Sequence, residues 1–144
     1  KQKTAYEMLR SLVGSEMCIR DRIYSEKAPD PIGPYSQAVL VNGLLYVSGQ
    51  VAIDSKNQDL ITGSIEAETT QVMENLGAIL KEASTDFSKV IKCSIFIKDM
   101  DNFAKINEIY GKYFSKNPPA RETIEVSKLP KNGNIEISCI ALVH

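Results

Sequence analysis

The sequence has few of the residues that most often carry catalysis or bind metals. It contains one histidine, the C-terminal His144, and no tryptophan among 144 residues. A terminal residue is usually poorly ordered, which argues against a histidine general base and against a histidine-rich metal site. Catalysis is therefore expected from carboxylates, arginine, tyrosine, backbone groups or water.

Paired cysteines are also lacking. The three cysteines (Cys18, Cys93 and Cys139) are odd in number and far apart, and no Cys-x-x-Cys motif occurs. This pattern favours reduced thiols in a cytoplasmic protein over a disulfide framework or a zinc site. Cys93 and Cys139 fall on the apolar faces of expected strands, so we expect both to be inert core residues.

Neither charge nor hydropathy indicates a nucleic-acid or membrane partner. The formal net charge is -1 at pH 7, without the basic excess of a nucleic-acid-binding surface. No apolar run approaches the roughly 20 residues that a membrane-spanning helix needs. The length suits one domain of ordinary size, which would bury about two thirds of its unfolded surface.

The first 22 residues differ in character from the rest. The chain does not begin with methionine, and residues 11–22 resemble a translated sequencing adapter joined to the reading frame. We therefore expect residues 1–22 to be a non-native extension and residues 23–144 to form the domain. The alternative is a genuine helical extension, with its helix over residues 6–19.

Local patterns predict the first half of the domain. A short strand is possible at residues 23–27. Two apolar, β-prone runs at residues 38–41 and 44–48 are separated by Asn42-Gly43, which predicts a type I′ hairpin. Ser64 is expected to cap a helix that ends near Ser84, because apolar residues recur there at helical spacing.

The second half alternates strands and a helix. A strand is predicted at residues 90–97, with Ile91, Cys93, Ile95 and Ile97 facing the core. Pro118-Pro119 requires a loop, which is followed by a strand through Arg121 and by a final strand at residues 135–143. Between them, residues 103–114 predict a helix with this buried stripe: Phe103, Ile106, Tyr110, Tyr113 and Phe114.

This order predicts an α+β fold, a mixed sheet with two helices packed on one face. We expect the helix-free face to carry both polar side chains (Arg121, Thr123 and Glu136) and large apolar ones (Phe96, Ile140 and Leu142). Such a face suits an interface combined with a pocket, which predicts a homo-oligomer with sites between subunits.

Arg121 is the leading candidate for ligand binding. The rigid Pro118-Pro119 loop delivers its guanidinium to the mouth of a strand, and the planar fork matches the two oxygens of a small carboxylate. The alternative is an ordinary surface arginine in a salt bridge.

Six motifs in the same order resemble the RidA (YjgF) family, and together they extend from about residue 23 to the C-terminus. They are Pro-Ile-Gly-Pro-Tyr-Ser-Gln-Ala at residues 31–38, Val-Ser-Gly-Gln at 47–50, Asp-Asn-Phe-Ala-Lys-Ile-Asn at 101–107, Pro-Ala-Arg at 119–121, Glu-Val-Ser-Lys-Leu-Pro at 125–130 and Ile-Glu-Ile at 135–137. The first 22 residues lie outside this resemblance.

The resemblance implies a chorismate-mutase-like fold and a homotrimer with three clefts at the subunit interfaces. It also implies deamination of reactive 2-imino acids, such as 2-iminobutanoate and 2-iminopropanoate, to 2-oxo acids and ammonium, without a metal or organic cofactor. The alternative is a non-catalytic member that binds a small ligand or acts in regulation, as a translation inhibitor or a chaperone-like protein.

On this resemblance, Arg121 would bind the substrate carboxylate and Glu136 would orient or deprotonate the attacking water. Thr123 stands where many members have cysteine, which weakens a thiol mechanism but not a water mechanism. Four further residues would line the cleft, although a structural role is an alternative for each: Tyr35, Ser48, Gly49 and Asn107.

Overall fold

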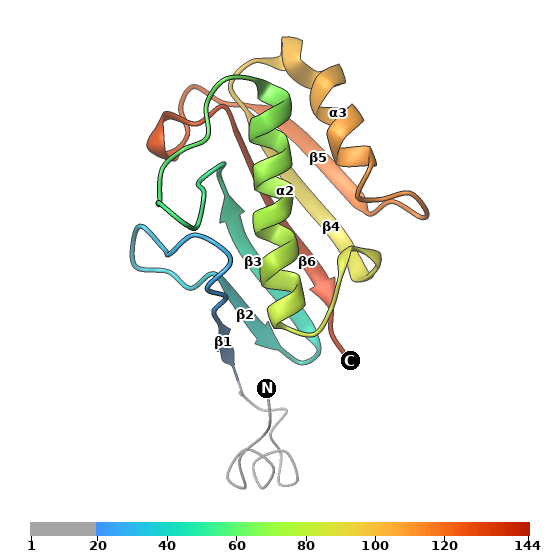
Figure 1. Cartoon of the computed structure of the whole chain (residues 1–144). Helices are drawn as coiled ribbons and strands as arrows, with labels where there is room; N and C mark the ends of the chain where they lie inside the picture. The colour runs from blue at the N-terminus through green and yellow to red at the C-terminus, as the bar shows by residue number, and fades with distance from the viewer. Residues whose placement is uncertain (1–19) are drawn as a thin grey trace, which may run out of the picture.

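Residues 20–144 are described by a computed structural model, and they form one six-stranded sheet with two helices on one face (Figure 1). The sheet order is β1-β2-β3-β6-β4-β5, and only the β4–β5 pair is parallel. The strands are β1 (Asp21–Ile23), β2 (Ala38–Val41), β3 (Leu44–Gln50), β4 (Val90–Ile97), β5 (Ala120–Glu125) and β6 (Ile135–Leu142). The helices are α2 (Ile65–Glu82) and α3 (Phe103–Gly111), and single 3-10 turns occur at Phe87–Lys89, Met100–Asn102 and Pro130–Asn132.

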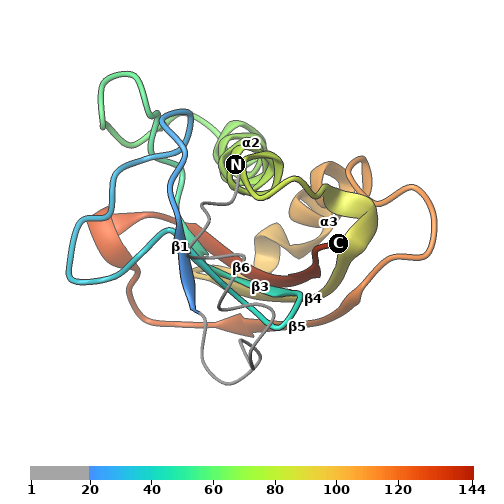
Figure 2. The same cartoon turned by 90° about the horizontal axis from the view of Figure 1, so that it is seen from below.

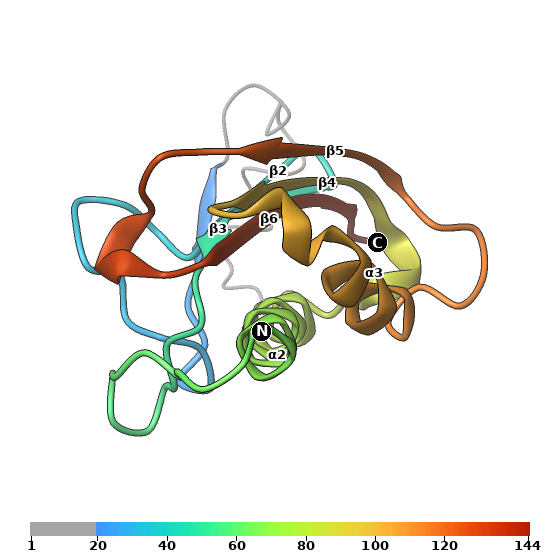
Figure 3. The same ribbon diagram turned by 90° about the horizontal axis from the view of Figure 1, so that it is seen from above.

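Both helices lie on the same side of the sheet, as the two end-on views show (Figures 2 and 3). The predicted α+β fold is therefore confirmed. The hydrophobic core fills the space between this helix layer and the sheet, and α2 contributes five fully buried apolar side chains to it: Val72, Met73, Leu76, Ile79 and Leu80.

The hairpin between β2 and β3 has the predicted turn. Asn42 has φ 52° and Gly43 has φ 76°, and Val41 pairs with Leu44 directly across the turn. Positive φ at both turn positions is the requirement of a type I′ turn, which glycine and asparagine meet most readily.

Helix α2 begins and ends close to the predicted positions. The Ser64 side chain accepts a hydrogen bond from the backbone N–H of Ala67 at 3.0 Å, which caps the helix. In the middle of α2, the buried Asn75 amide donates to the carbonyl oxygens of Val51 and Ile53. These bonds fasten the chain that leaves β3 to the helix.

Strand β4 departs from strict alternation. Ile91, predicted to face the core, is 42% exposed, whereas Val90 is buried. The pairing of β4 with β6 shifts register between Val90 and Lys92, and this irregularity turns Ile91 outward. Phe103 is a second exception to the predicted core, with 39% of its surface exposed.

The predictions for the N-terminal segment are only partly open to comparison, because residues 1–19 lie outside the described residues. The alternative of a helical extension, with its helix over residues 6–19, falls entirely within that part. The first strand covers Asp21–Ile23 rather than residues 23–27, and Asp21 and Arg22 pair with Leu40 and Val39 of β2.

The faces of β5 are the reverse of what we expected. In the parallel pairing with β4, Arg121 lies opposite Cys93 and Thr123 lies opposite Ile95, and both partners are fully buried. Paired residues share a face, so Arg121 and Thr123 lie on the helix-covered side. Alternation separates two faces but does not say which one the helices cover.

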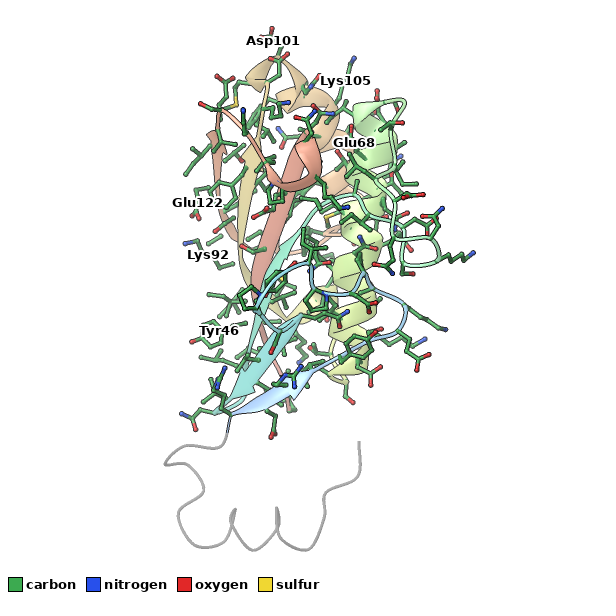
Figure 4. All side chains as sticks on the ribbon, turned by 90° about the vertical axis from the view of Figure 1, so that its left-hand side faces the viewer. Tyr46, Glu68, Lys92, Asp101, Lys105 and Glu122 are labelled. Atoms are coloured by element: carbon green, nitrogen blue, oxygen red, sulfur yellow. The ribbon has the colours of Figure 1, made fainter. Side chains whose placement is uncertain are left out.

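Glu136 does lie on the helix-free face, where it pairs with Phe96. In Figure 4, Tyr46, Lys92 and Glu122 project from the sheet on the side away from α2. Lys92 Nζ lies 3.0 Å from Glu122 Oε1. Large apolar side chains on this face are also exposed among residues 20–144, namely Tyr46 (45%), Ile124 (46%) and Leu142 (39%).

Candidate functional site

A cavity of about 280 Å³ opens where β3 ends and β6 begins. Its walls include four of the residues predicted from the sequence: Tyr35, Ser48, Gly49 and Glu136. Ile32 and Pro130 add apolar surface at the same place. The structure therefore brings together residues that are up to 101 positions apart in the chain, since the span from Tyr35 to Glu136 is 136 − 35.

Gly49 leaves room for the Glu136 side chain, which lies directly against it. A Cβ atom on residue 49 would come within 2.7 Å of Glu136 Cδ, which is closer than real Cβ contacts allow. The absence of a side chain on residue 49 lets the carboxylate lie across the end of β3. The glycine is therefore explained by close approach.

The Glu136 carboxyl group is half-buried, and burial raises its pKa above the ordinary glutamate value. Among residues 20–144, no side chain forms a salt bridge or a hydrogen bond with it. A carboxyl group with a raised pKa and no fixed partner among these residues is suited to accept and return a proton.

The loop that carries Tyr35 is fixed by hydrogen bonds. Ser48 Oγ donates to the carbonyl oxygen of Ser36 at 2.6 Å, so this hydroxyl holds the loop and its oxygen can still accept. The buried Gln37 amide donates to the Pro29 carbonyl at 2.8 Å. The Tyr35 ring itself remains 44% exposed at the cavity.

Arg121 lies elsewhere, beneath α3. Its Nη1 donates to Asn107 Oδ1 at 2.8 Å. The guanidinium carbon lies 5.0 Å from the centre of the Tyr110 ring and 5.6 Å from that of Phe103. Among residues 20–144, no carboxylate lies within salt-bridge distance of it, so the alternative of an ordinary salt-bridged arginine does not describe this side chain.

Two hydroxyl groups near Arg121, those of Tyr110 and Thr123, are buried without a nitrogen or oxygen partner among the described residues, and that of Tyr110 lies beside the Cys93 thiol. Burial raises the pKa of Tyr110 and of Cys93, so both are neutral at physiological pH. Burial also raises the pKa of Cys139. Both cysteines are buried, as their predicted place in the core requires.

The candidate residues thus form two groups. The glutamate half consists of Tyr35, Ser48, Gly49 and Glu136, and the arginine half consists of Asn107, Arg121 and Thr123. Arg121 is two strands from β6 and in register with Cys139, three residues from Glu136. Strand spacing and rise put the two backbones roughly 14 Å apart, and the side chains point to opposite faces. One protomer does not bring the two halves together.

Sequence reasoning missed two residues in contact with Arg121. Phe103 and Tyr110 were expected only to pack in the core, but both rings flank the guanidinium. Their spacing with Asn107 on one helix face (i, i+4, i+7) was the available signal. Within residues 20–144, no group of three histidine, cysteine, aspartate or glutamate side chains is placed to hold a metal.

Comparison with known proteins gives consistent matches. A human protein named 2-iminobutanoate/2-iminopropanoate deaminase is 44% identical over 124 residues, which cover 86% of this chain and 90% of that protein. A crystal structure of a protein of the conserved Rid family from Yersinia pestis has a TM-score of 0.85 at 44% identity, covering 87% of this chain and 100% of that one.

A crystal structure of TdcF from E. coli with bound serine has a TM-score of 0.82 at 31% identity, covering 86% of this chain and 99% of that one. Neither of the helices in the described part of the chain has the length and apolar character needed to cross a membrane.

A family model described as Endoribonuclease L-PSP matches residues 25–143. The chain therefore belongs to this family, the RidA (YjgF) family that its motifs resemble.

Proposed function

We propose that the protein hydrolyses 2-imino acids, such as 2-iminobutanoate and 2-iminopropanoate, to 2-oxo acids and ammonium. The observation that carries the proposal is a pair of complementary groups left without charged partners. Among residues 20–144, the Arg121 guanidinium contacts only neutral side chains, and the half-buried Glu136 carboxyl group faces a cavity. The name of the human relative supports the same reaction.

We further propose that the site is completed by a second copy of the chain in a homotrimer. Arg121 and Glu136 point to opposite faces of one sheet, so a common site requires the arginine half of one subunit beside the glutamate half of its neighbour. A closed ring repeats such a contact at each interface. The exposed apolar side chains on the helix-free face are available for burial in this assembly.

In this site the substrate carboxylate accepts two parallel hydrogen bonds from N–H groups of the planar Arg121 guanidinium. That contact fixes the electrophilic C=N carbon next to the cavity. Glu136 takes a proton from water while the water oxygen bonds to the carbon and the C=N electrons move to nitrogen. With the substrate as its protonated imine, Glu136 then returns this proton to nitrogen. The C–N bond breaks as the hydroxyl oxygen forms the C=O bond and releases its proton to the departing ammonia, so that ammonium and the 2-oxo acid leave.

Two features bear on other functions for the same chain. The word endoribonuclease in the family description implies an RNA substrate, but the formal net charge of -1 offers no basic excess for a phosphate backbone. A non-catalytic ligand-binding or regulatory role would need only the carboxylate contact of Arg121. We further propose a cytoplasmic location, supported by the unpaired, buried Cys93 and Cys139 of the described residues.

The test is imine hydrolysis by the full chain. A dehydratase generates 2-iminopropanoate in the cuvette, and semicarbazide competes for the free imine. We expect the wild type to divert the imine, Arg121→Ala to lose this activity, and Lys112→Ala, which removes an exposed charge at the end of α3, to keep it. A folded wild type that does no better than buffer would overturn the proposal and favour the ligand-binding role.

A further inference from the structure

Helix α3 presents three side chains to the guanidinium of Arg121. They are Phe103, Asn107 and Tyr110, at i, i+4 and i+7, so they lie on one face of the helix. Asn107 accepts one hydrogen bond from Nη1 at 2.8 Å, and the two rings lie 5.6 and 5.0 Å from the guanidinium carbon. One face of the helix therefore lies against the guanidinium.

None of these three groups carries a negative charge. An aromatic face attracts a cation through its quadrupole, so it holds the guanidinium without neutralising it. A carboxylate in the same place would form an ion pair and compete with a carboxylate ligand. Among residues 20–144, only one of the five guanidinium N–H groups is hydrogen-bonded, to Asn107, so the others remain available there for a ligand.

Tyr110 contributes its ring and not its hydroxyl group. The side chain is 5% exposed and packs against Phe114 with 4.8 Å between ring centres. Its hydroxyl group is buried and has no nitrogen or oxygen partner among residues 20–144, and it lies beside the Cys93 thiol. A thiol is a weak hydrogen-bonding group, so packing of the ring accounts for the tyrosine better than hydrogen bonding does.

We propose that Tyr110 and Phe103 are positioning residues, whose ring faces hold the Arg121 guanidinium in place and leave its charge available for the carboxylate of the substrate. Tyr110 forms the buried part of this aromatic cradle, and Phe103, at 39% exposure, forms its outer part. The kinetic consequence rests on the proposed imine hydrolysis, whereas the contact with the rings does not.

The kinetic test compares loss of the ring with loss of the hydroxyl group. Tyr110→Leu should raise KM roughly tenfold with kcat changed by less than about threefold, because the clamp binds the carboxylate in ground state and transition state alike. Tyr110→Phe should leave KM within about twofold of wild type. Phe103→Leu, at an exposed position, should raise KM in the same direction while the core stays intact.

Tyr113 provides the matched control on the same segment. Its ring packs against Phe87 at 5.2 Å and its hydroxyl group donates to Glu74 at 2.8 Å, away from Arg121. Tyr113→Leu should therefore leave KM unchanged. An unchanged KM in folded Tyr110→Leu and Phe103→Leu would overturn the proposal. A Tyr110→Phe variant as impaired as Tyr110→Leu would do the same, since the hydroxyl group would then matter.

A second readout does not depend on catalysis. The rings should shift the ¹H resonance of Arg121 Nε–H through their ring currents, and Arg121→Lys assigns the signal. We expect the shift to be lost in Tyr110→Leu and kept in Tyr113→Leu. If wild type hydrolyses no imine but the signal responds, the proposed function fails and the cradle stands. If hydrolysis is present and neither the signal nor KM responds, the cradle fails.

Discussion

The two halves of the candidate site differ in how they are built. The arginine half rests on regular structure, a helix face above an edge strand, and its charged group is held by neutral side chains. The glutamate half lies at the end of two strands under a loop, and its carboxyl group approaches a glycine. In the arginine half, uncharged neighbours leave the guanidinium charge available to a ligand. In the glutamate half, burial raises the pKa of the carboxyl group.

Both halves also leave polar groups unpaired in one protomer, which is unusual for buried groups. Thr123 and Tyr110 hold buried hydroxyl groups without nitrogen or oxygen partners among residues 20–144, and no side chain in that range pairs with the half-buried Glu136 carboxyl group. These groups support the proposal that the two surfaces become one site when copies of the chain associate.

The largest expected effect comes from two variants, each of which inactivates one half of the site. Arg121→Ala and Glu136→Gln should each lower kcat/KM by at least about a hundredfold, because one removes the carboxylate clamp and the other the proton acceptor. If neighbouring subunits share a site, an equal mixture that has exchanged subunits should regain about a quarter of wild-type activity, since that fraction of interfaces pairs two intact halves.

The control is the same mixture assayed before subunit exchange, which should stay inactive. Exchange is followed by native mass spectrometry after brief dilution into denaturant and refolding. Full exchange without recovered activity would contradict a site shared between subunits, and activity of either variant alone at the wild-type level would remove that residue from the mechanism.

The next effect concerns the contact between Gly49 and Glu136. Gly49→Ala places a methyl group within 2.7 Å of Glu136 Cδ, so the carboxyl group must move. We expect kcat to fall roughly tenfold to a hundredfold, the usual cost of a small misplacement of a catalytic group. Steady-state kinetics measure this, with folding checked by circular dichroism.

Gly111 supplies the matched control. It lies in α3, and a Cβ there would meet no atom within 4 Å. Gly111→Ala should leave kcat unchanged and stabilise the fold by about 0.5–1 kcal/mol, the gain expected for alanine over glycine in a helix. Equal kinetic losses in the two variants would mean that the Glu136 contact is not the cause.

The sequence predicted the local elements well, because their signals are local. Asn42-Gly43 and Ser64 specify a turn and a helix start through their own backbone and side-chain chemistry. The facing of β5 could not be predicted, because alternation is identical for both faces and the register on β4 depends on distant residues. The prediction that Ile91 faces the core was wrong for a related reason. One irregularity in strand pairing turns its side chain to the other face, and no residue pattern in the sequence indicates that irregularity.

The site shows the same division. Arg121 and Glu136 were recognisable as residues, but their separation on opposite faces was visible only in three dimensions. The role of Gly49 also depended on which side chain crosses it. The Phe103–Asn107–Tyr110 face was readable from helical spacing, yet its apolar members looked like core because nothing in the sequence placed a cation beside them.

A smaller effect is the pH dependence of stability, which should differ in sign between Glu136 and Glu122. Burial raises the pKa of Glu136 in the folded state, so the native protein binds an extra proton between the unfolded pKa and this raised value. Wild-type stability should therefore fall relative to Glu136→Gln as pH rises through that window. Over the same window kcat/KM should rise, because the base becomes deprotonated.

Glu122 gives the opposite sign. Its hydrogen bond from Ser94 and its contact with Lys92 lower its pKa, so its contribution is present above the unfolded pKa and is lost as pH falls through the folded value. As pH rises, the urea midpoint of wild type should fall relative to that of Glu136→Gln and rise relative to that of Glu122→Gln. Parallel trends would contradict the burial of Glu136 as the cause of its shift.

The smallest effect tests whether the arginine half is complete in one protomer. Thr123→Val replaces a buried hydroxyl group that lacks a partner among residues 20–144. Because we propose that a neighbouring copy completes this half, stability to urea should fall by about 1 kcal/mol, whereas equal or higher stability would mean that the hydroxyl group stays unpaired. Thr69→Val is the control, because that hydroxyl group donates to the Ile65 carbonyl at 2.7 Å and its loss should destabilise. A destabilised Thr123→Val would mean that the hydroxyl group is paired in the assembled protein. Its partner would then come from a neighbouring copy, at the place where the two halves meet.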